Sequence, residues 1–242
     1  MFYAPDIATL LVLPDVEAQH CVRVLRRQVG DVIDITDGKG YFYKARIVEA
    51  HPQHCAVQLL DTQLQVPARS NRIEIAVAPT KQLERIEWFA EKATEIGFDK
   101  ITLLQAQHSE RKDVKTDRIQ KIIVSAMKQS LKATLPEIQG MTAFSRFIRR
   151  PFEGLKCIAH CNQGEKQLLT TLFGGSIEIM PNVLILIGPE GDFSEVEVEE
   201  AVAYGFLPIS LGESRLRTET AALYALQTIH VIMSLRKGGI TL

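Results

Sequence analysis

The alternation of strand-like and helix-like segments after residue 72 constrains the fold of this 242-residue chain more than any other feature. Apolar, β-prone runs cover residues 72–78, 101–105, 155–160, 183–187 and 207–211, and helical patterns cover residues 83–96, 117–131, 195–204 and 218–236. Strands that alternate with helices in this way form a mostly parallel sheet covered on both faces. The sequence therefore predicts an α/β domain over residues 71–242.

The helix expected over residues 83–96 has the clearest amphipathic pattern. Its predicted inner stripe consists of Ile86, Phe89, Ala90 and Ala93. Gly97 follows directly, and we expect it to end the helix because glycine readily takes the conformation that closes a helix.

Residues 1–70 predict mostly β structure with one early helix. Asp15 is expected to cap a helix whose inward positions are Val16, Ala18, Cys21, Val22 and Leu25. A turn at residues 37–40 predicts a hairpin, and residues 56–60 predict a further strand. Short strands with tight turns are typical of a small barrel. Residues 67–71 are the best candidate linker, so the predicted domains are 1–70 and 71–242.

The composition is that of an ordinary globular protein, with 46% hydrophobic and 24% charged residues. No apolar run reaches the roughly 18 residues that a membrane helix needs. The N-terminus lacks the basic segment of a signal peptide. Four cysteines are too few and too scattered for a disulfide framework. We therefore expect a cytoplasmic protein with no membrane partner.

Cys157, His160 and Cys161 form the cluster that most resembles a metal site. On a strand, the two cysteines share one face and the histidine points to the other. No second ligand pair with zinc spacing lies nearby in the sequence. We expect small buried side chains here and no metal.

The charge is unevenly distributed although the net charge is only −1. Residues 71–150 carry 15 basic and 10 acidic side chains, whereas residues 151–242 carry 6 basic and 11 acidic ones. A local excess of Lys and Arg is what phosphate contacts require, and it can coexist with a neutral total. A solvated helix face would give the same excess, so this signal is weak by itself.

Residues 184–194 form the first of two segments that carry chemistry. An apolar strand runs into a loop between Gly188 and Gly191, and a helix then begins with the capping-box pair Ser194 and Glu197. Open α/β sheets bind ligands at such strand ends, and glycine lets the backbone approach a ligand closely. The loop lacks the Gly-Lys-Ser/Thr of a P-loop, and its acidic side chains would repel phosphate. A neutral or positive ligand fits better, with a plain tight turn as the alternative.

Residues 209–222 form the second segment, in which a strand again meets a glycine loop and then a helix. Thr218 is the expected helix cap, and Glu219 lies in the first turn, where the helix dipole favours an acid. Arg217 and Glu219 flank that cap. Each of the two, taken alone, could be an ordinary surface arginine or helix-start acid.

Together the two segments, LILIGPEGDFS and LGESRLRTETA, resemble the paired loops of SPOUT methyltransferases. The nearest resemblance is to the RsmE family, which methylates N3 of a uridine in 16S ribosomal RNA. It covers nearly the whole chain: residues 20–31 resemble the PUA-like RNA-binding domain of that family, and residues 91–97 and 109–111 fall where it has matching runs.

The resemblance implies a deep trefoil knot in the C-terminal part, a homodimer, and S-adenosylmethionine as cofactor. The sulfonium cation of that cofactor suits an acidic loop. The residues implied to surround it are Leu186, Ile187, Gly188, Pro189, Glu190, Gly191, Leu211, Gly212, Leu216, Thr218 and Ala221.

The implied reaction requires the uridine N3 to lose its proton before it attacks the methyl group. Arg217 is our candidate for stabilising the resulting anion, and Glu219 for orienting Arg217 or accepting the proton. The implied partner is 16S rRNA within the small subunit. The candidate residues for phosphate contacts are Arg23, Arg26, Arg27, Arg111, Lys128 and Lys132.

Two departures from the family pattern concern the RNA contacts and the first loop. The family often has a Glu-Gln pair and then an arginine ahead of a Leu-Pro pair, where this chain has lysines at 128 and 132. Lysine can meet a phosphate, but it cannot make the planar bidentate contact of arginine. Asp192 replaces a second glycine, which we interpret as tolerated loop variation.

Three other interpretations compete with a uridine methyltransferase. If the chain were an inactive assembly factor with the same fold, we would expect a cofactor loop that has lost its motif, and both loops here are intact. A phosphate-binding α/β enzyme is disfavoured by the acidic loop and the missing P-loop. A SPOUT enzyme that acts on transfer RNA or on a ribose hydroxyl is disfavoured by the N-terminal barrel and the LRTETA segment.

Overall fold

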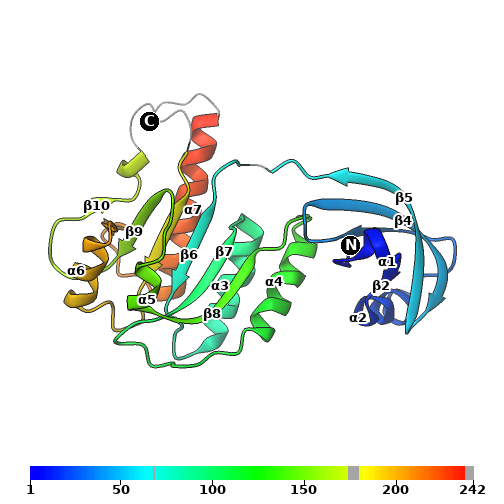
Figure 1. Cartoon of the computed structure of the whole chain (residues 1–242), viewed down its shortest axis with the longest axis horizontal. Helices are drawn as coiled ribbons and strands as arrows, with labels where there is room; N and C mark the ends of the chain where they lie inside the picture. Colours follow the sequence, from blue (N-terminus) through cyan, green and yellow to red (C-terminus); the bar gives the residue numbers. More distant parts are fainter. Residues whose placement is uncertain (68, 174–179, 238–242) are drawn as a thin grey trace. The chain divides into compact units, whose positions relative to one another are not determined.

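The computed structural model describes residues 1–67, 69–173 and 180–237, which form two compact units (Figure 1). Among these residues, one unit comprises 1–67 and 123–135, and the other comprises 69–122 and the rest of the chain. The segment 123–135 thus lies within the span predicted for the second domain and packs with the first unit. The predicted linker includes residue 68, which lies outside the described residues.

The first unit is a five-stranded, barrel-like sheet in the order β1-β3-β4-β5-β2. Its strands are β1 (Phe2–Tyr3), β2 (Val12–Leu13), β3 (Val32–Thr36), β4 (Tyr41–His51) and β5 (His54–Leu64), and its helices are α1 (Ile7–Leu10), α2 (Asp15–Gln19) and the π-helical turn η1 (His20–Val24). β1 pairs with β3 in parallel, and the other pairs are antiparallel. The predicted hairpin is confirmed as β3 and β4.

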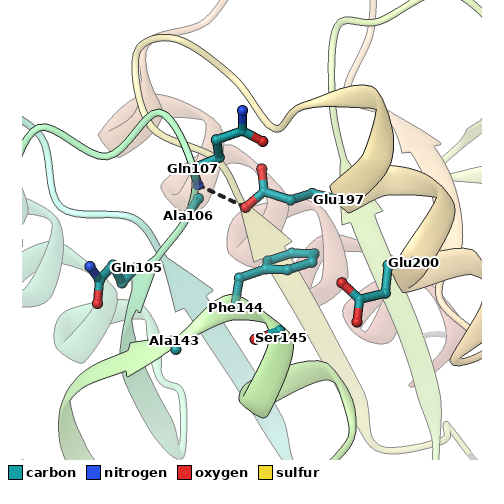
Figure 2. Close-up of a pocket in the computed structure, with 8 residues that line it drawn as sticks. All are labelled: Gln105, Ala106, Gln107, Ala143, Phe144, Ser145, Glu197 and Glu200. Atoms are coloured by element: carbon teal, nitrogen blue, oxygen red, sulfur yellow. Dashed lines mark hydrogen bonds between the residues drawn. The ribbon is translucent and has the colours of Figure 1, made fainter.

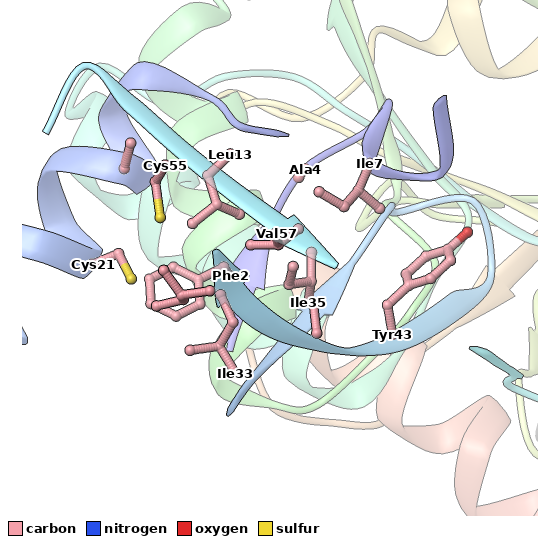
Figure 3. Close-up of a cluster of buried hydrophobic side chains, with 13 residues drawn as sticks. Phe2, Ala4, Ile7, Leu13, Cys21, Ile33, Ile35, Tyr43, Cys55 and Val57 are labelled. Atoms are coloured by element: carbon pink, nitrogen blue, oxygen red, sulfur yellow. The ribbon is translucent and has the colours of Figure 1, made fainter. Parts of the chain in front are cut away.

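The strands of the first unit enclose one apolar core (Figure 3). Along β4, Tyr43, Ala45 and Ile47 are buried, whereas Lys44 and Arg46 between them are exposed. This period of two is what a strand with one solvated face requires. The buried side chains of β4 therefore point into the core, and the charged ones point to solvent.

The early helix differs from the prediction at both ends. Pro14 is the N-cap and Asp15 the first helical residue, without a side-chain cap hydrogen bond. Ala18 and Cys21 are buried as predicted, but Val16 is 79% and Leu25 47% exposed. The π-helical turn has more residues per turn than an α-helix, so the α-helical spacing no longer applies after His20, which explains the exposure of Leu25. Val16 lies in the preceding α-helix, and its exposure has no such explanation.

The second unit is a seven-stranded sheet in the order β10-β12-β9-β11-β6-β7-β8, and all of its pairs are parallel. The strands are β6 (Ile73–Val77), β7 (Lys100–Gln105), β8 (Glu137–Ala143), β9 (Leu155–Ala159), β10 (Gln167–Leu168), β11 (Val183–Ile187) and β12 (Leu207–Ser210). The predicted parallel sheet is confirmed. β8 was not predicted, because this edge strand is half-exposed and carries a central glycine rather than an apolar run.

Helices cover both faces of this sheet (Figure 1). The helices of this unit are α3 (Leu83–Ile96), α5 (Phe144–Ile148), α6 (Glu195–Ala203) and α7 (Thr218–Lys237), with a 3₁₀ turn η2 (Thr171–Phe173). α4 (Asp117–Gln129) begins in this unit, and from residue 123 it belongs to the first. α3 packs on α7, and α7 also packs on β6 and β11, whereas α5 packs on α6. The four residues of the predicted inner stripe of α3 are all fully buried, and Gly97 is its C-cap with φ +118°.

Candidate active site at the carboxyl edge of the parallel sheet

The first predicted loop follows β11 at the carboxyl edge of the sheet and is held in place by its neighbours. Gly188 and Pro189 are buried, whereas Glu190 is exposed. A carboxylate oxygen of Glu190 accepts a hydrogen bond from the backbone N–H of Lys81 at 3.1 Å. A Cβ at Gly191 would lie 3.0 Å from Cβ of His108, so glycine allows this close approach.

Asp192 fastens this loop to the end of β9. Its φ is +63°, in the left-handed region that glycine occupies most easily, which explains why a glycine and an aspartate can replace each other here. One carboxylate oxygen accepts from the N–H of Phe193 at 2.8 Å, and the other accepts from the N–H of Cys161 at 2.6 Å. The carbonyls of Gly191 and Asp192 both lie 3.0 Å from Nδ1 of His108.

The helix after this loop begins with the predicted capping box, which is confirmed. The Ser194 hydroxyl accepts from the N–H of Glu197, and the Glu197 carboxylate accepts from the N–H of Ser194. The other carboxylate oxygen of Glu197 accepts from the N–H of Gln107 at 2.8 Å, as Figure 2 shows. Glu197 therefore ties the start of α6 to the loop after β7.

A polar hollow of about 380 Å³ lies beside this contact (Figure 2). It is lined by Gln105, Ala106, Gln107, Ala143, Phe144, Ser145, Glu197 and Glu200. Glu200 pairs with Arg149 at 3.0 Å, and Glu197 is engaged as described above. The two acidic side chains in the lining disfavour an anionic ligand such as phosphate.

The second predicted loop is more exposed and joins the first through one residue. Gly212 and Arg215 are exposed, while Leu211 and Leu216 are half-buried. Thr218 begins α7 and is buried, and its hydroxyl donates to the carbonyl oxygen of Gly188 at 3.0 Å. The hydroxyl therefore links the two loops instead of serving as the predicted helix cap.

The two candidate catalytic residues differ sharply in environment. Glu219 is buried, and one of its carboxylate oxygens lies 3.8 Å from a guanidinium nitrogen of Arg85 in α3. The other carboxylate oxygen has no hydrogen-bond partner among the described residues. Arg217 is exposed, and within the described part of the chain no ion pair joins it to Glu219. The carboxylate of Glu219 therefore has Arg85 as a cationic partner, and its predicted role in orienting Arg217 stays a prediction.

The remaining predicted cofactor residues lie along the same edge. Leu186 and Ile187 are buried at the end of β11, and Ala221 is half-buried in the first turn of α7. The structure thus brings the first loop and the start of α7 together through Thr218 and Gly188.

Sequence reasoning missed the residues that hold these loops from other elements. Arg85, His108 and Asn162 contact the site from the start of α3, the loop after β7 and the loop after β9. Their positions at or after the carboxyl ends of parallel strands were the available signal. Nothing in the spacing identified the particular side chains.

The predicted RNA-contacting residues fall into two groups. In the first unit Arg23, Arg26 and Arg27 are exposed, and Arg27 lies 3.8 Å from Asp31. Lys128 instead pairs with the buried Glu17 at 2.6 Å, and Lys132 is half-buried.

Arg111 lies in the second unit and is engaged with the backbone. Its guanidinium donates to the carbonyls of Thr80 and Lys81, at distances between 2.6 and 3.1 Å. Because Lys81 also donates to Glu190, Arg111 supports the first loop indirectly.

Two further observations bear on partners. In the described ranges, no group of three or more His, Cys, Asp and Glu side chains could hold a metal ion. None of the described helices has the length and apolar character that a membrane span needs.

Comparison with known proteins gives matches over both parts of the chain. Residues 67–230 match the family described as RNA methyltransferase domain, and residues 13–60 match the RNA methyltransferase PUA domain. A Bacillus subtilis protein named Ribosomal RNA small subunit methyltransferase E is 27% identical over 92% of this chain and 90% of its own length.

Two solved structures share the whole fold. A probable rRNA-methyltransferase from Porphyromonas gingivalis is 44% identical with a TM-score of 0.90, covering 97% of this chain and 98% of its own. Ribosomal RNA small subunit methyltransferase E from Neisseria gonorrhoeae, solved bound to S-adenosyl methionine, is 25% identical with a TM-score of 0.82 over 96% of each chain. The predicted combination of a barrel-like PUA domain with a parallel-sheet methyltransferase domain is confirmed.

Proposed function

This chain belongs to the RNA methyltransferase family, and we propose that it transfers a methyl group from S-adenosylmethionine to N3 of a uridine in 16S rRNA of the small ribosomal subunit. The relatives named Ribosomal RNA small subunit methyltransferase E support the rRNA substrate. The gonococcal structure supports the cofactor. The uridine and its N3 atom rest on the resemblance of residues 184–194 and 211–221 to the RsmE loops.

The residues at the carboxyl edge of the sheet fit S-adenosylmethionine. The buried carboxylate oxygen of Glu219 without a partner is the observation that carries this assignment, because a carboxylate there suits a cationic ligand or a proton donor. When bound, the cofactor supplies an electrophilic methyl group on a sulfonium ion. Backbone groups around Leu186–Gly191 and Leu211–Leu216 would hold it, and the bond between Thr218 and Gly188 keeps the two loops together.

Glu219 and Arg217 take complementary roles in this proposal. The uridine N3 carries a proton near neutral pH, and the unpartnered oxygen of Glu219 accepts it. The N3 electron pair then forms the new bond to the methyl carbon, and the electrons of the broken carbon–sulfur bond remain on sulfur. Arg217 is exposed and neutralises the charge that develops on the uracil oxygens. A well-placed base contributes about 10²- to 10⁴-fold in rate, and the positioning of both substrates supplies the rest.

Phosphate contacts are assigned chiefly to the exposed arginines of the first unit. Arg23, Arg26 and Arg27 can neutralise phosphates without breaking a buried contact. Lys132, which is half-buried, is the remaining candidate of the first unit. At Arg111 and Lys128 the phosphate would compete with backbone carbonyls and with Glu17, so their contributions are expected to be smaller.

The wider organisation follows from the same proposal. Residues 1–70 serve as a PUA-like RNA-binding domain and residues 71–242 as the methyltransferase domain with a deep trefoil knot. We further propose that the protein acts as a homodimer in the cytoplasm, where the small subunit is its partner.

Nucleoside mass spectrometry tests the reaction directly. Purified protein is incubated with S-adenosylmethionine and unmethylated small subunits, and the 16S rRNA is digested and analysed. We expect 3-methyluridine, formed about 10²- to 10³-fold more slowly by the Arg217→Ala variant. A different methylated nucleoside, or methylation of another RNA only, would overturn the proposed substrate. Cofactor binding with no methylation of any RNA, or no cofactor binding at all, would favour an assembly factor.

A further inference from the structure

His160 differs from the other described residues that have a buried, unpartnered side-chain atom. Both of its ring nitrogens are buried, and neither has a hydrogen-bond partner among the described residues. The other side chains with a buried unpartnered atom each have a second polar atom engaged: Glu17 with Lys128, Asn71 with Pro181, Arg150 with Glu74, and Glu219 with Arg85. His160 alone among them has no polar partner for its side chain.

The sheet places His160 between the two loops of the candidate site. It follows Ala159, the last residue of β9, which is in register with Ile187 of β11 on one side and Ile209 of β12 on the other. His160 therefore lies level with Gly188, where the first loop begins, and with Ser210, which precedes the second.

The backbone beside His160 is fixed. The N–H of Cys161 donates to Asp192, and the side chain of Asn162 donates to the carbonyl of Phe193. Nζ of Lys166 donates to the carbonyl oxygen of His160 at 3.3 Å and to that of Asn162 at 2.7 Å. These hydrogen bonds hold the backbone that carries the imidazole, and a ligand contact is preorganised when its backbone is held in this way.

A neutral imidazole has one N–H donor and one acceptor nitrogen, and leaving both buried and unpaired is costly. Burial lowers the pKa of His160, and the positive charge of Lys166 lowers it further, while Asp192 opposes the shift. The ring is therefore neutral at neutral pH. It can donate or accept a hydrogen bond there without adding a positive charge.

We propose that His160 is a cofactor-binding residue whose ring nitrogens hydrogen-bond to S-adenosylmethionine between the two loops. This inference rests on the proposed function. Its chemical basis is the match between an unpaired neutral imidazole and a ligand that carries hydrogen-bonding groups and a sulfonium charge. A protonated His160 would lose its acceptor and repel that charge.

Calorimetric titration of the full-length protein with S-adenosylmethionine tests the proposal. His160→Phe keeps an aromatic ring but removes both nitrogens, and we expect roughly 3- to 10-fold weaker binding at pH 7.5, the size of one or two hydrogen bonds. His54→Phe, an exposed histidine of the first unit, is the matched control and should bind like the wild type. Equal thermal midpoints for the two variants would show that the weaker binding is not a folding defect.

The pH dependence of binding provides a second readout. Wild-type affinity should fall as the pH drops through the lowered pKa of His160, because protons compete with the cofactor for the ring, and His160→Phe should lack this step. Lys166 and Asp192 are the charged groups that act on the ring. Lys166→Met should therefore move the midpoint to higher pH, and Asp192→Asn should move it to lower pH.

Nitrogen-15 spectra of the histidine rings report the contact itself. The His160 ring nitrogens, assigned by their absence in His160→Phe, should shift when S-adenosylmethionine is added. Unchanged affinity in His160→Phe together with unshifted ring signals would overturn this inference and leave the proposed function intact. A wild-type protein that binds no S-adenosylmethionine would instead overturn the proposed cofactor, and this inference with it.

Discussion

The hydroxyl of Thr218 donates a hydrogen bond to the carbonyl oxygen of Gly188 across 3.0 Å, and both residues are buried. It joins the first residue of α7 to the loop after β11, two segments that are 30 residues apart in the chain. Because each segment carries candidate cofactor residues, this bond fixes the position of one set of candidate residues relative to the other.

Thr218→Val should therefore weaken cofactor binding. Valine keeps the shape but cannot donate, so the Gly188 carbonyl is left buried and unpaired at a cost of about 1–3 kcal/mol. We expect a lower affinity for S-adenosylmethionine by calorimetry and a lower thermal midpoint. Thr220→Val, on the exposed side of the same helical turn, is the control and should change neither quantity.

Arg217→Ala should abolish most turnover and leave cofactor affinity nearly unchanged. The side chain is exposed and makes no ion pair within the described residues, so its removal should not affect folding. Loss of one group that stabilises charge in a transition state typically costs about 10²- to 10³-fold in kcat. Arg215→Ala, an exposed arginine in the same loop, is the matched control. Full methylation of rRNA by Arg217→Ala would refute the role assigned to Arg217.

Glu219→Gln should lower kcat by roughly 10²- to 10⁴-fold, because glutamine has nearly the same shape but is not a proton acceptor at neutral pH. The measurement is single-turnover methylation of small subunits at saturating cofactor. Glu213→Gln, an exposed position in the second loop, serves as control. If raising the pH to favour the uridine anion does not restore part of the rate, Glu219 acts through positioning and not as the base.

The parallel sheet and its helices could be predicted because their signals are local. β11 is five apolar residues in a row, and the inner stripe of α3 recurs at helical spacing, so burial on both sides can be deduced from the order of residues alone. The early helix was misjudged after His20 because a π-helical turn has no distinct hydrophobic period. β8 was missed because it is a half-exposed edge strand, and such a strand can form without a run of apolar residues.

The two segments of the site could be predicted from the sequence, but the contacts between their side chains could not. Gly188 and Thr218 were both identified as cofactor residues, but the bond between them depends on how α7 packs against β11. The contact of Glu219 with Arg85, and the unpaired ring of His160, depend in the same way on long-range packing. Such contacts join residues whose separation in the chain has no regular period.

Asp192 should be important for stability through its side chain and backbone together. Asp192→Ala removes the bonds to the N–H groups of Cys161 and Phe193 and leaves a Cβ at φ +63° without the polar side chain that stabilises this conformation, for an expected destabilisation of about 1–3 kcal/mol. Asp192→Gly removes the same bonds but keeps the conformational fit, so it should be less destabilised. Urea unfolding measures both, and equal destabilisation would show that the backbone conformation contributes nothing.

The exposed arginines after α2 should determine the salt dependence of RNA binding. If Arg23, Arg26 and Arg27 each neutralise a phosphate, alanine at all three should weaken binding most at low salt. The slope of log affinity against log salt should fall by about 0.7–0.9 for each phosphate that is no longer neutralised. Filter binding of 16S rRNA across a range of salt concentrations measures this slope.

The control for this experiment is Arg46→Ala, which removes an exposed arginine from β4 in the same unit. A general charge effect would change the slope for Arg46→Ala by as much as for each arginine of the triple variant. Lys128→Ala offers a second comparison, because Nζ of Lys128 is held 2.6 Å from Glu17 and should contribute less to the slope than an exposed arginine. It should instead lower the stability of the first unit, since Glu17 would remain buried without its partner. A triple variant with the wild-type slope would place the phosphate contacts elsewhere on the protein.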